Sequence, residues 1–227
     1  MPAPSKPKAV VAWSSGKDSA YALLTAQRAG VFDIVGILTT VTAAFERVSM
    51  HGVREALLER QAAELGLPCH KVYIPSPCPN EVYEGKMSEA VSQAKAQGVS
   101  HFIFGDLYLE DIRRYRVERL EPAGIASEFP LWQRDTRALA EEMLAVGLRA
   151  VVTCIDPSKL DKSWAGRRFD ARFLADLPAG VDPCGENGEF HTFVTDGPMF
   201  RRPIAVRSGE IVERDGFVFA DVLPVTA

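Results

Sequence analysis

Six consecutive residues near the start of the chain have the types that bind an anion. They are Ser14, Ser15, Gly16, Lys17, Asp18 and Ser19, directly after the apolar run Val10–Trp13. Small residues let backbone N–H groups approach a ligand closely, and a helix that follows adds the positive end of its dipole. Lys17 would add a point charge, and Asp18 suits a phosphate that carries magnesium. The alternative is that Ser14 or Asp18 caps the helix and Lys17 is solvated.

A second group of chemically capable residues follows another apolar run. Gly105 permits a tight exit from that run, and Asp106 would lie at the carboxyl end of a strand, where magnesium or a ribose binds. Three arginines share one face of the predicted helix that follows: Arg113, Arg116 and Arg119. Such a face suits phosphate or carboxylate groups. The alternative is a solvated helix in which neighbouring acidic residues pair with the arginines.

A third group lies in the stretch GVDPCGENGEFHTFVTDGP, residues 180–198. Its polar members are Asp182, Glu186, Glu189 and His191, set among glycines that allow close backbone approach. The carboxylates would hold a cation or an ammonium-like substrate, and Glu189 or His191 would serve as a general base. The alternative is a folded turn whose carboxylates accept hydrogen bonds from backbone amides.

The elements that must position these groups follow an alternating pattern. Short apolar runs predict strands over residues 10–13, 34–41, 72–74, 101–104 and 150–155. Helical periodicity predicts helices over residues 19–28, 53–65, 81–97, 109–120 and 137–146, and glycines stop most of them. Alternation of this kind predicts β-α-β units and an α/β fold with a five-stranded parallel sheet and helices on both faces.

The pattern changes near Pro130, after which prolines and glycines become frequent. Residues 204–206 and 211–219 predict antiparallel strands, with tight turns at Ser208-Gly209 and Asp215-Gly216. We therefore expect a larger domain over 1–130, which contains the parallel sheet, and a smaller α+β subdomain over 131–227.

Composition excludes several classes of protein. The chain has 227 residues, a formal net charge of −4 and 47% hydrophobic residues, so no large nonspecific nucleic-acid interface is expected. No apolar run reaches 18 residues, which predicts no membrane span. The start, MPAPSKPK, lacks an apolar signal segment, and we interpret it as the frayed tail of a cytoplasmic protein. The four cysteines form no C-x-x-C pair, so zinc-finger and redox motifs are not indicated.

The loop over residues 14–19 lacks the spacing of a Walker A or a G-x-G-x-x-G motif. It resembles the S-G-G-K-D-S loop of the ATP pyrophosphatases (adenine-nucleotide α-hydrolases, a Rossmann-like, HUP-type fold), with Ser15 in place of the first glycine. Members of that family hold the β–γ pyrophosphate of ATP in this loop and cleave between the α and β phosphates. A positive φ at Ser15 would be strained. In that family the loop after the second strand lies near the adenosine, so His51, otherwise a cap or surface residue at a helix start, becomes a candidate contact.

The order of the motifs narrows the resemblance. The chain is similar to the diphthine–ammonia ligase family over about Val10 to Phe200. The similarity lies in the order of four motifs: S-G-K-D-S, then G-D with R-x-R-V-E, then P-L-W, then G-V-D-P-x-G-E-x-G-E. That family carries the motif E-G-G-E-[FY]-E-T. Here the matching residues are Glu186, Asn187, Gly188, Glu189, Phe190, His191 and Thr192. Asn187 and His191 depart from the motif, and His191 would alter recognition of a cationic diphthine head group.

The resemblance implies an ATP-dependent amide ligase that adenylates a diphthine-like carboxylate, transfers ammonia to it, and releases AMP and pyrophosphate. It assigns catalysis to Lys17, Asp18, Asp106 and Glu189, and Mg²⁺ to Asp18 and Asp106. It assigns ATP to Ser14, Ser15, Gly16, Lys17, Asp18, Ser19, His51, Gly105 and Arg116. It assigns the acceptor to Glu186, Asn187, Gly188, His191 and Thr192. A translation elongation factor is one candidate for the acceptor, and a homodimer is open. The alternatives are another carboxylate acceptor, RNA thiolation, and a nucleotide-binding protein without catalysis.

Overall fold

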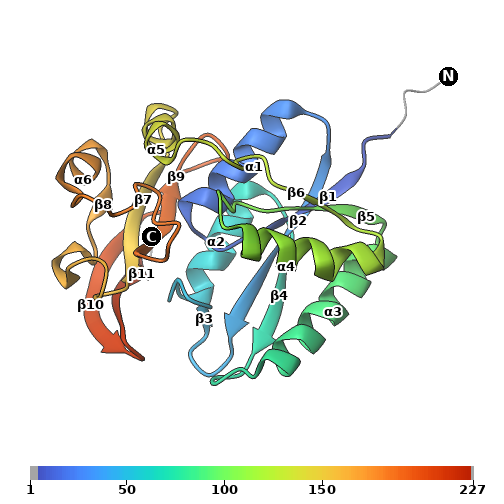
Figure 1. Cartoon of the computed structure of the whole chain (residues 1–227), viewed down its shortest axis with the longest axis horizontal. Helices are drawn as coiled ribbons and strands as arrows, with labels where there is room; N and C mark the ends of the chain where they lie inside the picture. The colour runs from blue at the N-terminus through green and yellow to red at the C-terminus, as the bar shows by residue number, and fades with distance from the viewer. Residues whose placement is uncertain (1–4, 226–227) are drawn as a thin grey trace.

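Two β-sheets organise the chain, and they lie side by side in Figure 1, sheet A in blue to green and sheet B in yellow to red. The structure is a computed structural model, and it describes residues 5–225. The first four residues of the predicted N-terminal tail lie outside the described residues. No helix in the described range is both long and apolar enough to cross a membrane.

Sheet A is mainly parallel. Its strands are β1 (Lys8–Ala12), β2 (Asp33–Thr42), β3 (Arg47–Val48), β4 (Cys69–Ile74), β5 (Val99–Ile103) and β6 (Ala126–Glu128). Five of them pair in parallel in the order β4-β2-β1-β5-β6, and the short β3 adds to β2 in the antiparallel direction beyond the end of β1. The predicted α/β fold with a parallel sheet is confirmed.

Helices cover both faces of sheet A. They are α1 (Lys17–Ala29), α2 (Glu55–Leu65), α3 (Asn80–Ala96) and α4 (Glu110–Leu120), with a 3₁₀ turn η1 (Glu121–Ala123) after α4. Alternate residues of β1 face opposite sides, so Ala9 and Val11 pack with α1 and α2, while Val10 packs with α3 and α4. Burial on both faces explains why the central strands read as continuous apolar runs.

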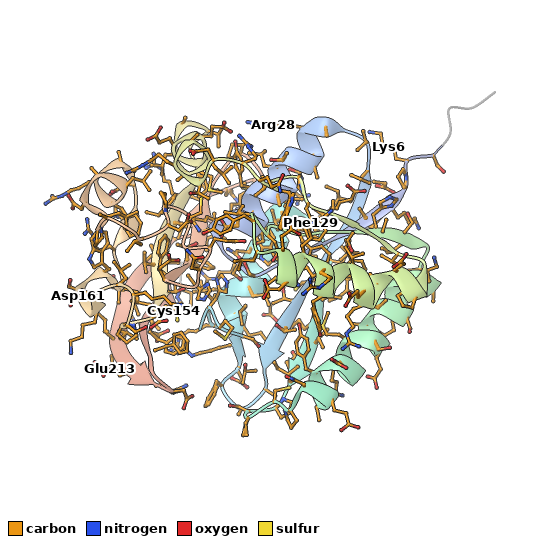
Figure 2. All side chains as sticks on the ribbon, in the orientation of Figure 1. Lys6, Arg28, Phe129, Cys154, Asp161 and Glu213 are labelled. Carbon is orange, nitrogen blue, oxygen red and sulfur yellow. The ribbon has the colours of Figure 1, made fainter. Side chains whose placement is uncertain are left out.

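Sheet B holds the later strands. They are β7 (Arg149–Ile155), β8 (Arg168–Phe169), β9 (Phe190–Asp196), β10 (Val206–Arg214) and β11 (Phe217–Pro224). Helix α5 (Thr136–Ala145) precedes β7, and η2 (Lys162–Trp164) and α6 (Ala171–Asp176) lie between strands of this sheet in the chain. β7 is central and pairs antiparallel with β8, β9 and β11. Figure 2 shows Cys154 on this strand.

Two expectations about strands are wrong in detail. Residues 150–155 were expected in the parallel sheet, but β7 belongs to the antiparallel sheet B, and β6 supplies the fifth parallel strand. A buried run has the same appearance in the centre of either kind of sheet. Ser208-Gly209 is a register shift inside β10 rather than a turn, whereas the predicted turn at Asp215-Gly216 is confirmed.

The two sheets share one apolar core. Helices α1 and α2 pack on sheet A with one side and against β9 and β11 of sheet B with another. The Val194 N–H on β9 donates to the Ser15 carbonyl at 2.9 Å. The loop that leads into α1 therefore lies where the sheets meet. The division of the chain at residue 130 stays a prediction.

Candidate active site

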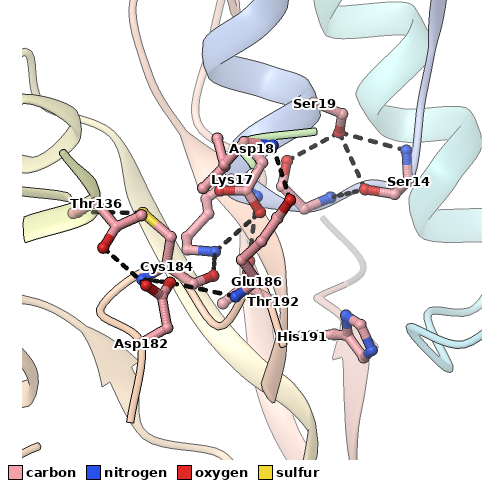
Figure 3. A network of polar contacts seen from close by, with 12 residues as sticks. Ser14, Lys17, Asp18, Ser19, Thr136, Asp182, Cys184, Glu186, His191 and Thr192 are labelled. Carbon is pink, nitrogen blue, oxygen red and sulfur yellow. Dashed lines mark hydrogen bonds and ion pairs between the residues drawn. The ribbon is translucent and has the colours of Figure 1, made fainter. Parts of the chain in front are cut away.

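The loop between β1 and α1 supplies no side-chain cap at the N-cap position of the helix. Gly16 is the residue before α1, and no side chain caps the helix there. Ser14 Oγ instead accepts from the Gly16 N–H at 3.3 Å and lies 3.1 Å from Ser19 Oγ, which donates to the Gly16 carbonyl at 3.0 Å (Figure 3). The alternative that Ser14 or Asp18 caps the helix is therefore wrong.

Ser15 has the conformation that the related glycine would adopt without strain. Its φ is +70°, in the left-handed region. Its carbonyl accepts hydrogen bonds from the Val194 N–H at 2.9 Å and from Gln61 Nε2 at 3.1 Å. Its hydroxyl oxygen is buried and has no hydrogen-bond partner among the described residues. The loop therefore contains a polar atom that faces no protein partner.

His51 packs directly against Gly16. A Cβ at Gly16 would lie 2.7 Å from His51 Cε1, so only glycine fits beside this ring. His51 Nδ1 donates to the Thr192 carbonyl at 3.0 Å, which leaves Nε2 without the proton, and the ring lies 4.6 Å from that of His191. Burial lowers the pKa of His51 to about 4, and burial also lowers the pKa of His191. Both imidazoles are neutral near pH 7.

His51 does not open a helix, as had been expected. Helix α2 begins at Glu55, because residues 47–54 turn back on themselves through hydrogen bonds between Val48 and Val53 and a bridge between Arg47 and Arg54. The structure brings His51 against Gly16 of the loop, and its predicted contact with the adenosine stays a prediction.

Lys17 reaches from the loop into the C-terminal part of the chain. Its side chain is 1% exposed, and Nζ donates to Asp18 Oδ2 at 2.9 Å and to the Cys184 carbonyl (Figure 3). The Phe190 ring lies 5.1 Å from Nζ. Burial acts to lower the pKa of Lys17, but the Asp18 carboxylate holds it above its ordinary value. The ammonium group therefore stays charged and ties the loop to residues 182–189.

Asp106 and Gly105 lie at the end of β5, against the first turn of α1. A Cβ at Gly105 would lie 2.7 Å from the Asp18 carbonyl carbon. Both Asp106 oxygens accept hydrogen bonds from Arg116, at 2.6 and 3.0 Å, and the guanidinium stacks on Phe104. Asp106 and Asp18 thus have different partners, and the described residues contain no ready cluster of three or more metal-binding side chains.

The other two arginines of this helix face have separate partners. The Arg113 guanidinium lies over the Phe129 and Trp132 rings, at 5.4 and 5.1 Å. Arg119 pairs with Glu84 on α3. The helix face therefore does not present three free guanidinium groups, and Arg116 is the member that stands beside the loop end of β5.

Residues 182–189 form a tight turn held by carboxylates. Asp182 Oδ1 accepts from the N–H groups of Cys184 and Glu186, and Asp182 Oδ2 accepts from Thr136 Oγ1 at 2.7 Å. Glu189 Oε1 accepts from the Asp182 N–H and from Asn187 Nδ2, both at 3.1 Å. Glu189 Oε2 is buried without a partner in the described chain. Amide binding therefore occupies most of these oxygens, and one Glu189 oxygen is left over.

Glu186 links this turn to the chain after Asp106. Its Oε1 accepts from the N–H groups of Leu107 at 2.7 Å and Tyr108 at 3.3 Å. Burial raises the pKa of Glu186 to about 7, and the nearby Asp18 and Asp106 carboxylates act in the same direction. Gly188 takes a φ of +81° in the turn, and Thr192 Oγ1 on β9 accepts from the Lys17 N–H at 3.1 Å. Residues from both ends of the chain thus build one site.

A cavity of about 540 Å³ opens beside the loop. Ser14 and the ends of β1, β2 and β5 form its floor, and α3 and α4 form its walls, with Tyr83 and Arg116 among the lining residues. The lining mixes apolar side chains with a few polar groups, as in sites for small molecules of nucleoside size.

Sequence reasoning missed two supporting residues. Gln61 and Thr136 hold the Ser15 carbonyl and Asp182, respectively. Gln61 had a signal, because the spacing of Leu57, Leu58 and Leu65 puts it on the same apolar helix face. Thr136 had no signal, because only the fold brings it to Asp182.

Two family models together match most of the chain. Residues 7–125 match the diphthamide synthase N-terminal domain, and residues 135–221 match the diphthamide synthase C-terminal domain. The first match alone covers more than half of the chain. The chain belongs to the diphthamide synthase family. The family resemblance read from the loop at 14–19 and from the motif at 186–192 is thereby confirmed.

Curated members of the diphthamide synthase family are similar to this chain. The proteins named diphthine–ammonia ligase from Bos taurus and Homo sapiens are each 33% identical over 120 residues, which cover 50% of this chain and 45% of theirs. The one from Danio rerio is 36% identical over 124 residues, covering 50% of this chain and 47% of its own. The aligned part thus spans about half the length of these relatives.

Proposed function

We propose that this protein is an ATP-dependent amide ligase that adenylates a carboxylate of the diphthine type and joins it to ammonia, releasing AMP and pyrophosphate. The observation that carries the proposal is the N-terminal end of α1 behind a small-residue loop. Gly16 at the N-cap supplies no side-chain cap, and the facing segment 182–192 contacts this end through Thr192 Oγ1, which accepts from the Lys17 N–H. An uncapped helix end with close backbone approach attracts anions. The name of the curated relatives supports the choice of reaction.

The first step forms a mixed anhydride. A carboxylate oxygen of the acceptor attacks the α-phosphorus, the bond from that phosphorus to the α–β bridging oxygen breaks, and pyrophosphate leaves with the electron pair. Backbone N–H groups of the loop and Arg116 would stabilise the charge on the phosphates, since phosphoryl transfer depends mainly on positioning and electrostatics. Lys17 and Ser19 would fix the loop in its binding shape.

The second step forms the amide. Ammonia attacks the acyl carbon of the adenylate, AMP leaves with the bond electrons, and the attacking nitrogen loses a proton. Glu189 Oε2 is a buried carboxylate oxygen without a hydrogen-bond partner in the described chain, which supports it as the acceptor of that proton.

One carboxylate of this site, that of Asp18, is available to bind magnesium. Asp18 Oδ1 has no hydrogen-bond partner in the described chain, and Mg²⁺ usually binds one or two carboxylates together with substrate phosphates. Asp18 would hold the ion, and Asp106 would join it only by leaving Arg116. When bound, the ion would neutralise phosphate charge.

The acceptor would lie against residues 186–192, with Glu186, Asn187, Gly188, His191 and Thr192 as its contacts. His191 is a neutral imidazole whose ring lies tilted against that of His51, and a glutamate at that position would be an anion. A neutral ring attracts a cationic head group less strongly than a carboxylate does. A translation elongation factor as acceptor, a homodimer and a cytoplasmic location stay predictions.

RNA thiolation is less well supported. That chemistry needs an accessible thiolate, but Cys154 and Cys184 are buried. Burial raises the pKa of Cys154 to about 12 and raises that of Cys184 further from neutrality. A nucleotide-binding protein without catalysis would leave Glu189 Oε2 without a function.

The proposal is tested by measuring nucleotide products with purified protein, MgATP, an ammonium salt and diphthine-modified elongation factor. We expect AMP and pyrophosphate in equal amounts, dependent on the acceptor. Release of ADP and phosphate would contradict the mechanism. AMP release that requires a different carboxylate would contradict only the acceptor.

A further inference from the structure

A buried glutamine on α2 contacts the loop that leads into α1. Gln61 is 0% exposed and lies on the apolar face of its helix. Its Oε1 accepts from Trp13 Nε1 at 2.9 Å, and its Nε2 donates to the carbonyls of Ser15 at 3.1 Å and Val194 at 2.8 Å. One side chain thus joins the end of β1, the loop and β9.

The orientation of this amide has a single solution. The Trp13 indole N–H is only a donor, so it must face the amide oxygen. The two backbone carbonyls are only acceptors, so they must face the amide nitrogen. A rotation of the amide by half a turn would lose all three hydrogen bonds. Gln61 therefore holds its partners in one arrangement.

The Ser15 carbonyl is the point at which Gln61 acts on the loop. Ser15 has a φ of +70°, and its carbonyl also accepts from the Val194 N–H. The peptide group between Ser15 and Gly16 is planar, and in the trans form its N–H points away from its C=O. Two hydrogen bonds that fix the carbonyl therefore fix the direction of the Gly16 N–H, which donates a long hydrogen bond of 3.3 Å to Ser14 Oγ.

We infer that Gln61 is a positioning residue: it holds the Gly16 N–H on the Ser14 side of the loop, where a terminal phosphate of ATP would replace the long hydrogen bond to Ser14 Oγ. The inference rests on the proposed function. Gln61 itself is sealed from the ligand and acts through the Ser15 carbonyl. Its loss would therefore weaken binding of the pyrophosphate part of the nucleotide and leave binding of AMP nearly unchanged.

The test compares dissociation constants for MgATP, inorganic pyrophosphate and AMP, measured by calorimetry on the full chain. Gln61→Met keeps similar length and volume but removes all three hydrogen bonds. We expect the Kd values for MgATP and pyrophosphate to rise about tenfold or more, as for loss of a buried hydrogen-bond partner. We expect the Kd for AMP to change less than about twofold, because AMP lacks the phosphates that the loop holds. An equal weakening of ATP and AMP, or no change in either, would overturn the inference.

Leu58→Met is the matched control, since Leu58 is buried on the same face of α2 and has no polar contact to lose. Leu58→Met should leave the Kd values for MgATP, pyrophosphate and AMP unchanged. If it weakened binding of MgATP and pyrophosphate but not of AMP, as expected for Gln61→Met, that result would count against the inference. If Gln61→Met does not fold, Gln61→Leu removes the same three hydrogen bonds with a smaller apolar side chain, and it should weaken MgATP and pyrophosphate binding but not AMP binding in the same way. A wild-type chain that binds no ATP overturns both proposals. If the wild-type chain binds ATP, but no better than the folded Gln61 variants do, the role of Gln61 is overturned and the proposed function is not.

Discussion

Ser15 carries two unfavourable features, a φ of +70° and a buried hydroxyl oxygen with no partner in the described chain. In the left-handed region a non-glycine residue costs roughly 1–2 kcal/mol. Glycine removes that strain but loses more entropy on folding, by about 0.5–1 kcal/mol. We expect Ser15→Gly to raise the free energy of unfolding by about 1 kcal/mol, measured by urea denaturation of the ligand-free protein.

Ser15→Ala separates the two features, because it removes the hydroxyl and keeps the strained backbone. Ser15→Gly should be the more stable of the two by a few tenths of a kcal/mol to about 1 kcal/mol. A Ser15→Ala protein that is more stable than Ser15→Gly would show that the backbone at this position is not strained.

Glu186 makes stability depend on pH in a definite direction. Its pKa is about 7 in the folded chain, raised by burial and then by Asp18 and Asp106, against an ordinary value of 4.5. Between about pH 4.5 and pH 7, Glu186 therefore keeps its proton in the folded state and has lost it in the unfolded state. The stabilising contribution is complete below about pH 4.5 and is lost as the pH rises through 7.

Glu186→Gln removes this titration and keeps an oxygen for the Leu107 N–H. In urea denaturation, the variant should gain stability relative to the wild type as the pH is raised from 5 to 8. A difference in unfolding free energy that stays constant over this range would contradict the raised pKa.

Single residues were predictable where their type alone carries the information. The stop signals Gly30 and Gly66 are confirmed, because left-handed glycines leave few alternatives. Residues 14–16 lie in the turn between β1 and α1, and binding of a phosphate by residues 14–19 stays a prediction. Gln61 was not predicted, because a glutamine on an apolar helix face reveals its partners only in the folded chain.

At the scale of elements, Gly105 sets how closely β5 approaches α1. A Cβ there would lie 2.7 Å from the Asp18 carbonyl carbon and 2.8 Å from the Ser19 nitrogen, and these backbone atoms have no room to move cheaply. We expect Gly105→Ala to lower the free energy of unfolding by about 1–3 kcal/mol, as other overpacking substitutions do. It should also weaken ATP binding by displacing the first turn of α1.

Gly85→Ala in α3 is the control, because a Cβ there would meet nothing within 4 Å. It should raise stability by up to about 1 kcal/mol through helix propensity and leave ATP binding unchanged. Unfolding by urea and calorimetry with MgATP measure both effects. A Gly105→Ala protein that behaves like Gly85→Ala would contradict the close packing of β5 on α1.

Most element positions followed from periodicity, but the sheet to which a strand belongs did not. Helix α5 was expected over 137–146 and lies at Thr136–Ala145, whereas the strand after it joins sheet B instead of sheet A. Burial on both faces gives the same run of apolar residues in both settings. The partners of β7 come from later in the chain, and local pattern carries no information about them.

At the scale of the whole molecule, the site depends on contacts between distant parts of the chain. The Lys17 N–H donates to Thr192 Oγ1 across a separation of 175 residues. The order of the motifs predicted that these segments share a function, through the family resemblance. It did not predict that β9 would bind the loop directly or that Lys17 would reach the Cys184 carbonyl.

In the proposed mechanism, the loop before α1 binds the β- and γ-phosphates of ATP. A crystal structure of the protein with Mg²⁺ and α,β-methylene-ATP, whose α–β bond cannot be cleaved, measures this most directly. We predict β- and γ-phosphate oxygens about 2.7–3.2 Å from backbone nitrogens of residues 14–19, with the adenosine in the cavity beside Ser14. A triphosphate bound elsewhere, with no phosphate at residues 14–19, would contradict the proposed position of ATP.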